Sequence, residues 1–546
     1  MLGLMQDWPL TLDRIIDHGA RNHGHREIVT RSIEGPLVRT TYADLRRRAR
    51  QGSHGLAELG IKPGDRVATL AWNTHRHVEL WYAAMGMGAV CHTLNPRLHP
   101  DQICWIIRHA GDKVIFADLT FAPLLMARRA DMTTVEKIVL LSDEGHRPTD
   151  AGPDVIMYEE WLAGRPHKGE DAPAWGGFDE RTAAGLCYTS GTTGDPKGVL
   201  YSHRSNFLHT LLAMQGDAMG ISSRDTVLAV VPMFHANAWG LPFTAPAVGA
   251  KLVLPGMKLD GASVHELLET EGVTFSAAVP TVWQMLLQHL RETGGRISTL
   301  KTVIIGGSAC PGALIRAFHD DYGVEVLHAW GMTETSPLGT VGSLSPEIAA
   351  LPFDQQMEWR LKQGRPPLGI ELQVRGPDGR LQPEDGVSQG RLTVRGPTIA
   401  SAYFGGKAGD ALDPLGEFDT GDIATIDPQG YMRITDRAKD VIKSGGEWIS
   451  SIDIENLIVG HPAVALAAVI GMPHPKWDER PMLVVQLKPG ASATAQDLLA
   501  FLDGKIAKWW MPDEVAFVET VPLGPTGKID KKALRAQFFE QSASAA

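Results

Sequence analysis

The sequence is poor in cysteine, and its cysteines show no paired spacing. Cys91, Cys104, Cys187 and Cys310 are scattered over 546 residues. A disulfide framework and a zinc site both use cysteines at short, repeated spacings, so the pattern argues against both. Unpaired thiols are typical of proteins in a reducing compartment, and we therefore expect a cytoplasmic protein.

Long hydrophobic runs and a secretory signal are also missing. Apolar stretches such as AVALAAVIGM are far shorter than the roughly 18 residues that a membrane span needs. The start, MLGLMQDWPLTLDR, lacks a basic segment followed by a long apolar core. No integral membrane association is therefore expected.

Positive charge is in deficit, with 52 Lys and Arg against 63 Asp and Glu and a formal net charge of −11. General nucleic-acid binding depends on neutralising phosphates with basic side chains, so we expect no nucleic-acid partner. Hydrophobic residues make up 43% of the chain and charged residues 21%, as in ordinary globular proteins. The length allows more than one domain.

Short β-branched runs alternate with amphipathic stretches before about residue 365. These runs lie at 66–72, 113–118, 137–142, 226–232, 251–255, 273–280 and 302–308. Apolar strands separated by helical patterns predict an α/β fold with parallel sheets covered by helices on both faces. Farther along, apolar residues alternate by twos between Gly, Pro and Asp turns, which predicts an antiparallel or barrel-like region. The end of the chain predicts a small α+β lobe.

The stretch YTSGTTGDPKGVLYSH, residues 188–203, gathers hydroxyl side chains and glycines around one lysine. Glycines let backbone N–H groups approach an anion closely, and hydroxyls add donors. The stretch therefore predicts a phosphate-binding loop, although it lacks the Gly-Lys-Ser/Thr ending of the P-loop. A flexible surface loop is the alternative for this stretch alone.

Four further stretches are open to a functional and a structural interpretation. HAWGMTETS (328–336) offers Trp330 for stacking on a base and Glu334 for Mg²⁺, or else a buried tryptophan and a helix cap. EFDTGDIA (417–424) offers Asp422 to a ribose diol, although an aspartate in a turn often caps backbone. ITDRAKDVIKSGGEWIS (434–450) and PLGPTGKIDKKALR (522–535) carry basic residues that also suit a solvated face.

Together these motifs, in this order and spacing, resemble the adenylate-forming family, which holds acyl-CoA synthetases, adenylation domains and luciferase. The resemblance covers about residues 10 to 540. It implies a large N-terminal domain, 1–434, and a small mobile C-terminal domain, 435–546, that rotates about a hinge near Lys439. It also implies the reaction: a carboxylate attacks ATP to form an acyl-adenylate, and CoA then takes the acyl group.

The resemblance assigns roles to individual residues. Mg²⁺ is implied at Thr189 and Glu334, and the nucleotide is implied to contact a larger set. That set is Thr189, Ser190, Gly191, Thr192, Thr193, Gly194, Lys197, Gly307, Ser308, Ala309, His328, Ala329, Trp330, Thr333, Asp422, Arg437, Lys439 and Trp448. The implied catalytic residues are Lys528 for adenylation, His235 beside the reacting carboxylate, and Lys443 in the loop offered to the thiol.

The acid is predicted from VPMFHANAWGLPF, residues 231–243. The stretch holds no acidic residue to pair with an ammonium group, so an α-amino acid is not expected. Here His235, Trp239 and Gly307 are the expected substrate contacts, and Trp239 is placed to line or gate an acyl tunnel. The stretch resembles fatty-acyl-CoA ligases of medium or long chains, in a branch that also holds 3-methylmercaptopropionate-CoA ligases.

Several alternatives stay open at this point. The acid can instead be short or aromatic, the acceptor can be a carrier protein, and a luciferase-type oxygenation or a non-catalytic binder is not excluded. The expected partners are a carboxylic acid, ATP and CoA, with a homodimer as an option.

Overall fold

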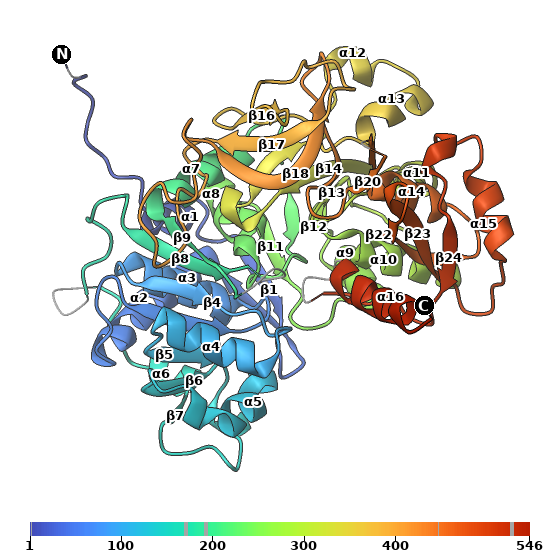
Figure 1. Ribbon diagram of the computed structural model, residues 1–546. Helices are drawn as coiled ribbons and strands as arrows, with labels where there is room; N and C mark the ends of the chain where they lie inside the picture. Colours follow the sequence, from blue (N-terminus) through green and yellow to red (C-terminus); the bar gives the residue numbers. More distant parts are fainter. Residues whose placement is uncertain (2, 169–172, 190–194, 446, 525–528, 546) are drawn as a thin grey trace.

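Two predominantly parallel sheets form the bulk of the N-terminal region (Figure 1). The structure, a computed structural model, describes residues 1, 3–168, 173–189, 195–445, 447–524 and 529–545. The first sheet has seven strands. Its order is β7 (Val155–Met157), β6 (Lys137–Leu140), β5 (Val114–Ala117), β3 (Arg66–Leu70), β4 (Val90–Thr93), β8 (Ala183–Tyr188) and β9 (Gly198–Ser202), with only the β8–β9 pair antiparallel among these named strands.

The second sheet has eight strands and contains the strands on which the site is built. Its order is β15 (Leu338–Val341), β14 (Glu325–Gly331), β13 (Thr302–Ile305), β12 (Phe275–Ala278), β10 (Thr226–Leu228), β11 (Lys251–Leu254), β1 (Glu27–Arg31) and β2 (Leu37–Thr41). The end pairs β14–β15 and β1–β2 are antiparallel, and the inner pairs are parallel. The strands predicted between residues 66 and 308 all lie in these two sheets.

Helices cover the sheets, as the alternating pattern predicts. In the N-terminal region they are α1 (Asp13–Asn22), α2 (Tyr42–Glu58), α3 (His75–Gly86), α4 (Pro100–Ala110), α5 (Ala122–Ala127), α6 (Tyr158–Leu162), α7 (His203–Ala213), α8 (Leu241–Val248), α9 (Gly261–Thr270), α10 (Pro280–Thr293), α11 (Gly312–Tyr322), α12 (Pro346–Ala349) and α13 (Phe353–Arg360). Helix α3 is buried along almost its whole length and contacts β1 of one sheet and β4 and β8 of the other. A helix that is apolar on most sides belongs between two sheets, and α3 joins them into one core.

The region after about residue 365, in which apolar residues alternate by twos, forms an antiparallel sheet of four strands beside the parallel sheets. These strands are β16 (Glu371–Arg375), β17 (Gly390–Arg395), β18 (Phe418–Ile426) and β19 (Met432–Arg437). Because β18 and β19 pair with Asp422 opposite Arg437, two predicted ribose contacts become neighbours.

A small α+β lobe follows, in orange and red in Figure 1. Its sheet holds β20 (Ile442–Ser444), β21 (Glu447–Ile449), β22 (Val464–His474), β23 (Asp478–Leu487) and β24 (Glu514–Phe517). Its helices are α14 (Ser451–Ile458), α15 (Ala495–Leu502) and α16 (Lys531–Ala545). The predicted class, parallel α/β sheets with an antiparallel region and a small α+β lobe, is confirmed.

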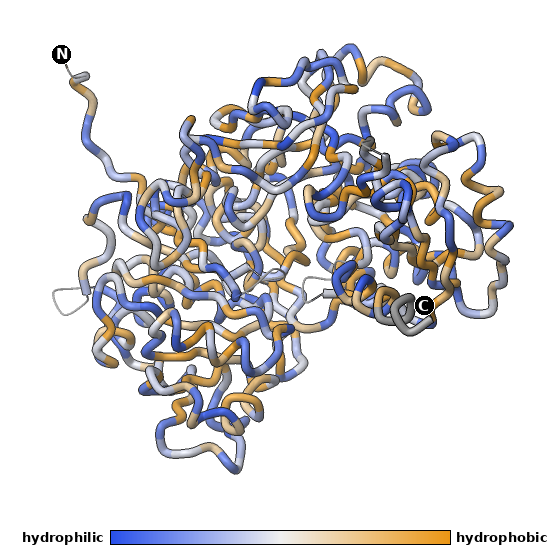
Figure 2. The backbone as a smooth tube through the Cα atoms, in the orientation of Figure 1, coloured by the Kyte–Doolittle hydropathy of each residue, from blue (hydrophilic) through white to orange (hydrophobic). Residues whose placement is uncertain are grey.

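Hydrophobic and hydrophilic stretches are interleaved along both lobes (Figure 2). Among the described residues, no helix is long and apolar enough to cross a membrane. The four cysteines are all buried and none is paired in a disulfide. These observations agree with the sequence, in which apolar runs are short and cysteines are isolated.

Candidate active site

The carboxyl ends of β13 and β14 lie side by side and form one edge of the candidate site. Ile305 at the end of β13 pairs with His328 in β14. In open α/β sheets, ligands bind beyond the carboxyl ends of the strands. The loop after β13 begins with Gly306 and Gly307, and a side chain at Gly306 would collide with the Ala329 carbonyl oxygen at 2.9 Å. Glycine is therefore required where the two segments come together.

Glu334 is the acidic residue of this edge. It lies in a short 3₁₀ turn, η5 (Thr333–Thr335), directly after β14, and only 6% of its surface is exposed. Burial raises the pKa of Glu334, whereas the Tyr403 hydroxyl and the charges of Arg437 and Lys197 lower it. A buried carboxylate close to two cations suits a hard metal ion carried by phosphates.

Asp422 and Arg437 form an ion pair beside Glu334. The Arg437 Nε atom lies 2.9 Å from Asp422 Oδ1, and the Trp330 indole Nε1–H donates to Asp422 Oδ2 at 3.0 Å. Asp422 is 1% exposed on its side chain and Arg437 is 40% exposed. The aspartate is thus held in place by its neighbours, and the more exposed guanidinium retains donors for a ligand.

The predicted adenine contacts differ in how accessible they are. Ser308 is exposed, and Gly307 and Ala309 are half-buried, so this segment is accessible from solvent. His328 is buried with both ring nitrogens occupied, Nδ1 by the Leu361 carbonyl and Nε2 by the Cys310 N–H. Burial lowers the pKa of His328 to about 4, so the imidazole is neutral and holds two loops together.

Trp330 is largely covered by protein, which differs from an open stacking surface. Only 6% of its surface is exposed, and it packs in a cluster with Leu392 and Met432. A side chain at Gly339 would penetrate the Trp330 ring, so glycine there makes room for the indole. The interaction that the structure shows for Trp330 is its hydrogen bond to Asp422. Base stacking by Trp330 stays a prediction.

The glycine-rich loop is described only at its two ends. Thr189 N–H donates to the Lys197 carbonyl at 2.9 Å, and this bond joins the two ends of the loop that connects β8 to β9. Ser190, Gly191, Thr192, Thr193 and Gly194 lie outside the described residues. The Lys197 ammonium lies 4.8 Å from the centre of the Tyr403 ring.

The acyl stretch folds into a left-handed turn. Residues 236–240 all have positive φ, from 42° to 79°, in a 3₁₀ segment labelled η4 (Ala236–Gly240). A left-handed conformation costs a non-glycine residue about 1–2 kcal/mol, so surrounding contacts must hold it. The Asn237 side-chain amide donates to Asn206 Oδ1 at 3.3 Å, and Thr244 donates to the Gly240 carbonyl at 3.0 Å.

This turn places Trp239 over Gly306, at the carboxyl end of β13. The tip of the indole would lie 3.0 Å from a Cβ atom at position 306. Half-buried Trp239 packs against the main core cluster, which also contains Ile304, Leu327 and Ala329 from β13 and β14. His235 is half-buried just before the turn. The surroundings of Trp239 are therefore mainly apolar, with the His235 imidazole just before the turn.

The candidate residues of the small lobe lie on its first hairpin. Lys443 of β20 and Trp448 of β21 are directly paired across the hairpin, and Lys443 is exposed. Lys439 is exposed just before β20. Lys528, the predicted adenylation lysine, lies outside the described residues.

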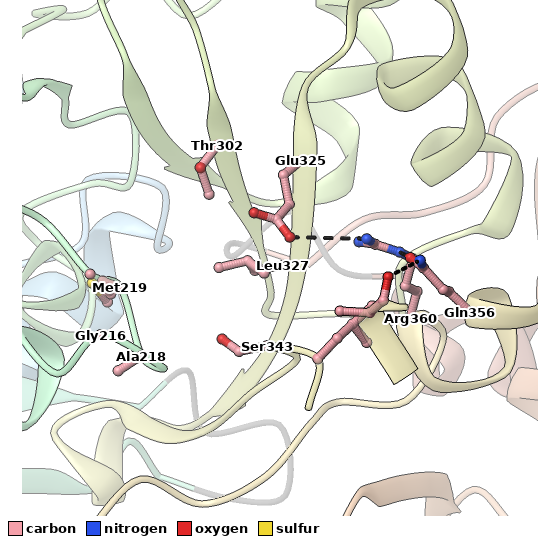
Figure 3. A pocket seen from close by; sticks show the side chains of 12 residues that line it. Gly216, Ala218, Met219, Thr302, Glu325, Leu327, Ser343, Gln356 and Arg360 are labelled. Atoms are coloured by element: carbon pink, nitrogen blue, oxygen red, sulfur yellow. Dashed lines mark hydrogen bonds and ion pairs between the residues drawn. The ribbon is translucent and has the colours of Figure 1, made fainter. Parts of the chain in front are cut away.

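A cavity of about 350 Å³ lies away from these residues (Figure 3). Thr302 and Glu325, which begin β13 and β14, line it, so it opens at the strand ends opposite to Gly306 and Trp330. Arg360 and Gln356 form its polar wall. Of the predicted nucleotide contacts, Lys197 and Arg437 lie near Glu334, and Asp422 pairs with Arg437.

Tyr403 is the site residue that sequence reasoning missed. Its hydroxyl donates to Glu334 Oε1 at 2.8 Å from a position 69 residues farther along the chain. The surrounding sequence, SAYFGG, carries no spacing that points to a nucleotide. Only the three-dimensional fold joins the two residues.

The described residues contain no group of three or more His, Cys, Asp or Glu side chains arranged to hold a metal ion. A magnesium ion that arrives with ATP takes several ligands from phosphates and water, so one or two protein oxygens suffice. Glu334 and the Thr189 hydroxyl fit that limited role.

Comparison with known families identifies both lobes. Residues 16–404 match the AMP-binding enzyme family, and residues 453–528 match the C-terminal domain of AMP-binding enzymes.

Relatives match over nearly the whole chain. A 3-methylmercaptopropionyl-CoA ligase of Ruegeria lacuscaerulensis is 49% identical, with 98% of this chain and 99% of the relative covered. A medium-chain-fatty-acid–CoA ligase of Ectopseudomonas oleovorans is 46% identical (98% and 98% covered), and a long-chain-fatty-acid–CoA ligase of Thermus thermophilus is 45% identical (98% and 96%). The crystal structure of the anthranilate CoA ligase AuaEII with anthranoyl-AMP has the same fold, with a TM-score of 0.86 at 24% identity over 99% of this chain and 100% of that one.

Proposed function

Because the chain belongs to the AMP-binding enzyme family and is an ATP-dependent acyl-CoA ligase, we propose that it activates a fatty acid of medium to long chain. A carboxylate cannot acylate a thiol directly, since its leaving group would be oxide. Attack on the α-phosphorus of ATP converts it to an acyl-adenylate with loss of pyrophosphate. CoA then displaces AMP, and no covalent enzyme intermediate is needed.

The first step brings two anions together, so the site must supply positive charge where charge develops. We assign Lys197 and the loop before it to the β- and γ-phosphates, Thr333 to the α-phosphate, and Arg437 with Asp422 to the ribose. Mg²⁺, when bound at Glu334 and Thr189, would neutralise phosphate charge. Lys528 is proposed to bridge the substrate carboxylate and nucleotide oxygens.

The second step needs the thiol to reach the acyl-adenylate. We propose that the small lobe rotates about Lys439 and presents the β20–β21 hairpin, with Lys443 and Trp448, to the CoA entrance. The exposed position of Lys443 on that hairpin supports this role. We propose that the C-terminal domain begins at residue 435, a few residues before this hinge.

The observation that carries the substrate proposal is the charge-free turn 236–240 with Trp239 packed over Gly306. No acidic or basic side chain belongs to this turn, so it suits an uncharged acyl tail. His235 is proposed to stand beside the reacting carboxylate, with Gly307 close to it. Each buried methylene contributes about 0.8 kcal/mol, which favours longer chains until the space is filled.

A second candidate substrate is 3-methylmercaptopropionate, because relatives 49% and 48% identical carry that name. Its short, uncharged thioether tail fits the same wall. Pyrophosphate release with straight-chain acids, 3-methylmercaptopropionate and benzoate, each with and without CoA, separates the candidates. The proposal expects kcat/KM to rise with chain length, and it fails if 3-methylmercaptopropionate or benzoate exceeds every fatty acid.

Two broader features belong to the proposal. The unpaired cysteines support a reducing, cytoplasmic location. The N-terminal arm extends away from the body in Figure 1, with exposed Leu4 and Met5, and we propose that it contacts a second copy in a homodimer.

A further inference from the structure

Tyr403 lies between two residues that the proposed function places on the phosphates and the metal. Its hydroxyl donates to Glu334 Oε1 at 2.8 Å, and the Lys197 ammonium lies 4.8 Å from the centre of its ring. One side chain thus contacts an anion with its polar end and a cation with its ring.

The backbone of the loop that carries Tyr403 is hydrogen-bonded to Glu334 at one end and to Gly198 at the other. Ala400 N–H donates to the backbone carbonyl of Glu334 at 2.8 Å, and Phe404 N–H donates to the Gly198 carbonyl at 2.7 Å. Gly198 begins β9, directly after Lys197. The loop therefore spans from the metal-side residue to the end of the phosphate loop, with Tyr403 in the middle.

The phenol ring keeps two opposite charges close without letting them neutralise each other. Glu334 accepts from the Tyr403 hydroxyl and Lys197 lies over the Tyr403 ring, and among the described residues no ion pair within 4.0 Å joins Lys197 to Glu334. A direct pair would use the ammonium and carboxylate that the ligand needs. A ring attracts an ammonium through its quadrupole and leaves the charge available.

We propose that Tyr403 is a positioning residue that sets Glu334 for the metal and Lys197 for the phosphates. This inference rests on the proposed function of the site. A carboxylate has about four acceptor positions, so one bond from Tyr403 fixes the orientation of the group and leaves positions for a hard cation. Among the described residues, the hydrogen bond and the cation–ring contact of Tyr403 go to Glu334 and Lys197, so its effect is expected at the polyphosphate end.

Calorimetric binding of AMP, of ATP without metal, and of ATP with Mg²⁺ tests the inference. In Tyr403→Phe, the gain in ATP affinity that Mg²⁺ provides falls about tenfold, as expected when a hydrogen bond to a charged group is lost. The affinities for AMP and for metal-free ATP stay unchanged. In Tyr403→Leu, metal-free ATP also binds about threefold more weakly, because Lys197 loses the ring.

Tyr201→Phe is the matched control, because it removes the hydroxyl of a buried tyrosine in the cluster against which Tyr403 packs. The Tyr201 hydroxyl donates to the uncharged backbone carbonyl of Thr333 at 2.8 Å. The Mg²⁺-dependent gain is expected to match wild type in this variant. The inference is overturned if Tyr403→Phe keeps the wild-type gain, or if Tyr201→Phe loses as much. If wild type itself shows no Mg²⁺-dependent gain, the metal assignment of Glu334 fails, and the inference fails with it.

Discussion

Single side chains in the cleft are held by partners that are distant in sequence. Asp422 is fixed by Arg437 and Trp330, and Glu334 by Tyr403. The motifs predicted Asp422, Arg437 and Glu334, because their residue types suit ribose and metal. Tyr403 was beyond prediction, since a lone tyrosine in a turn-rich stretch carries no pattern and its contact depends on the whole fold.

Trp239 and His235 lie on the same short segment and are expected to act differently. Trp239→Ala opens space over Gly306, so the preference shifts towards longer or bulkier acids and selection for short ones weakens. His235→Ala is expected to lower turnover for every acid, because His235 is proposed to stand beside the carboxylate that all the acids share. The measurement is kcat/KM across straight-chain acids and 3-methylmercaptopropionate. An unchanged chain-length profile in Trp239→Ala would place the tail elsewhere.

Among the elements, the turn η4 is the one whose conformation the sequence did not reveal. Its residues Asn237, Ala238 and Trp239 carry no glycine signal, yet all adopt left-handed backbone. The strands of both sheets were predictable, because β-branched runs between helical patterns depend on local sequence. The left-handed turn is held by a tertiary hydrogen bond to Asn206 and by a local one from Thr244 to Gly240.

Glycine substitution measures the strain in this turn. Ala238→Gly removes a buried methyl group, worth about 0.8 kcal/mol, but relieves about 1 kcal/mol of left-handed strain, so the net change is near zero. Ala245→Gly, in the right-handed helix α8, loses the methyl group and about 1 kcal/mol of helix propensity. Both alanines are fully buried. In urea denaturation, the free energy of unfolding should fall by about 2 kcal/mol in Ala245→Gly and stay near the wild-type value in Ala238→Gly. Equal losses in the two variants would mean that the turn is not strained.

At the scale of the whole molecule, β19 and α14 are joined by a row of contacts across the predicted hinge. Arg433 lies 2.6 Å from Asp453, the Ser450 hydroxyl donates to the Thr435 carbonyl, and Ser451 N–H and Oγ donate to Asp436 at 2.7 Å. Rotation about Lys439 would have to break them. The order of the lobes was predictable from the motifs, but their contacts were not, because they depend on orientation.

Arg433→Ala weakens this row and is expected to change the balance of the two half-reactions. An exposed ion pair contributes up to about 1 kcal/mol, so the ratio of adenylation to thioester rate constants shifts by up to about fivefold. Arg395→Ala is the control, because Arg395 pairs with Glu371 inside one sheet at 2.5 Å. Rapid-quench measurement of both steps gives the ratio. If the ratio shifted equally in Arg395→Ala, the cause would be the loss of a surface charge and not the loss of the contact across the hinge.

The proposed reaction runs in two steps through an acyl-adenylate that is bound without a covalent link to the enzyme, and this intermediate can be measured. The enzyme is mixed with ATP, Mg²⁺ and a medium-chain fatty acid without CoA, and bound acyl-AMP and pyrophosphate are quantified before and after CoA is added. We expect one equivalent of each per active site, followed by conversion of the acyl-AMP to acyl-CoA and AMP. Acyl-CoA formation with no acyl-AMP and no CoA-independent pyrophosphate would contradict it.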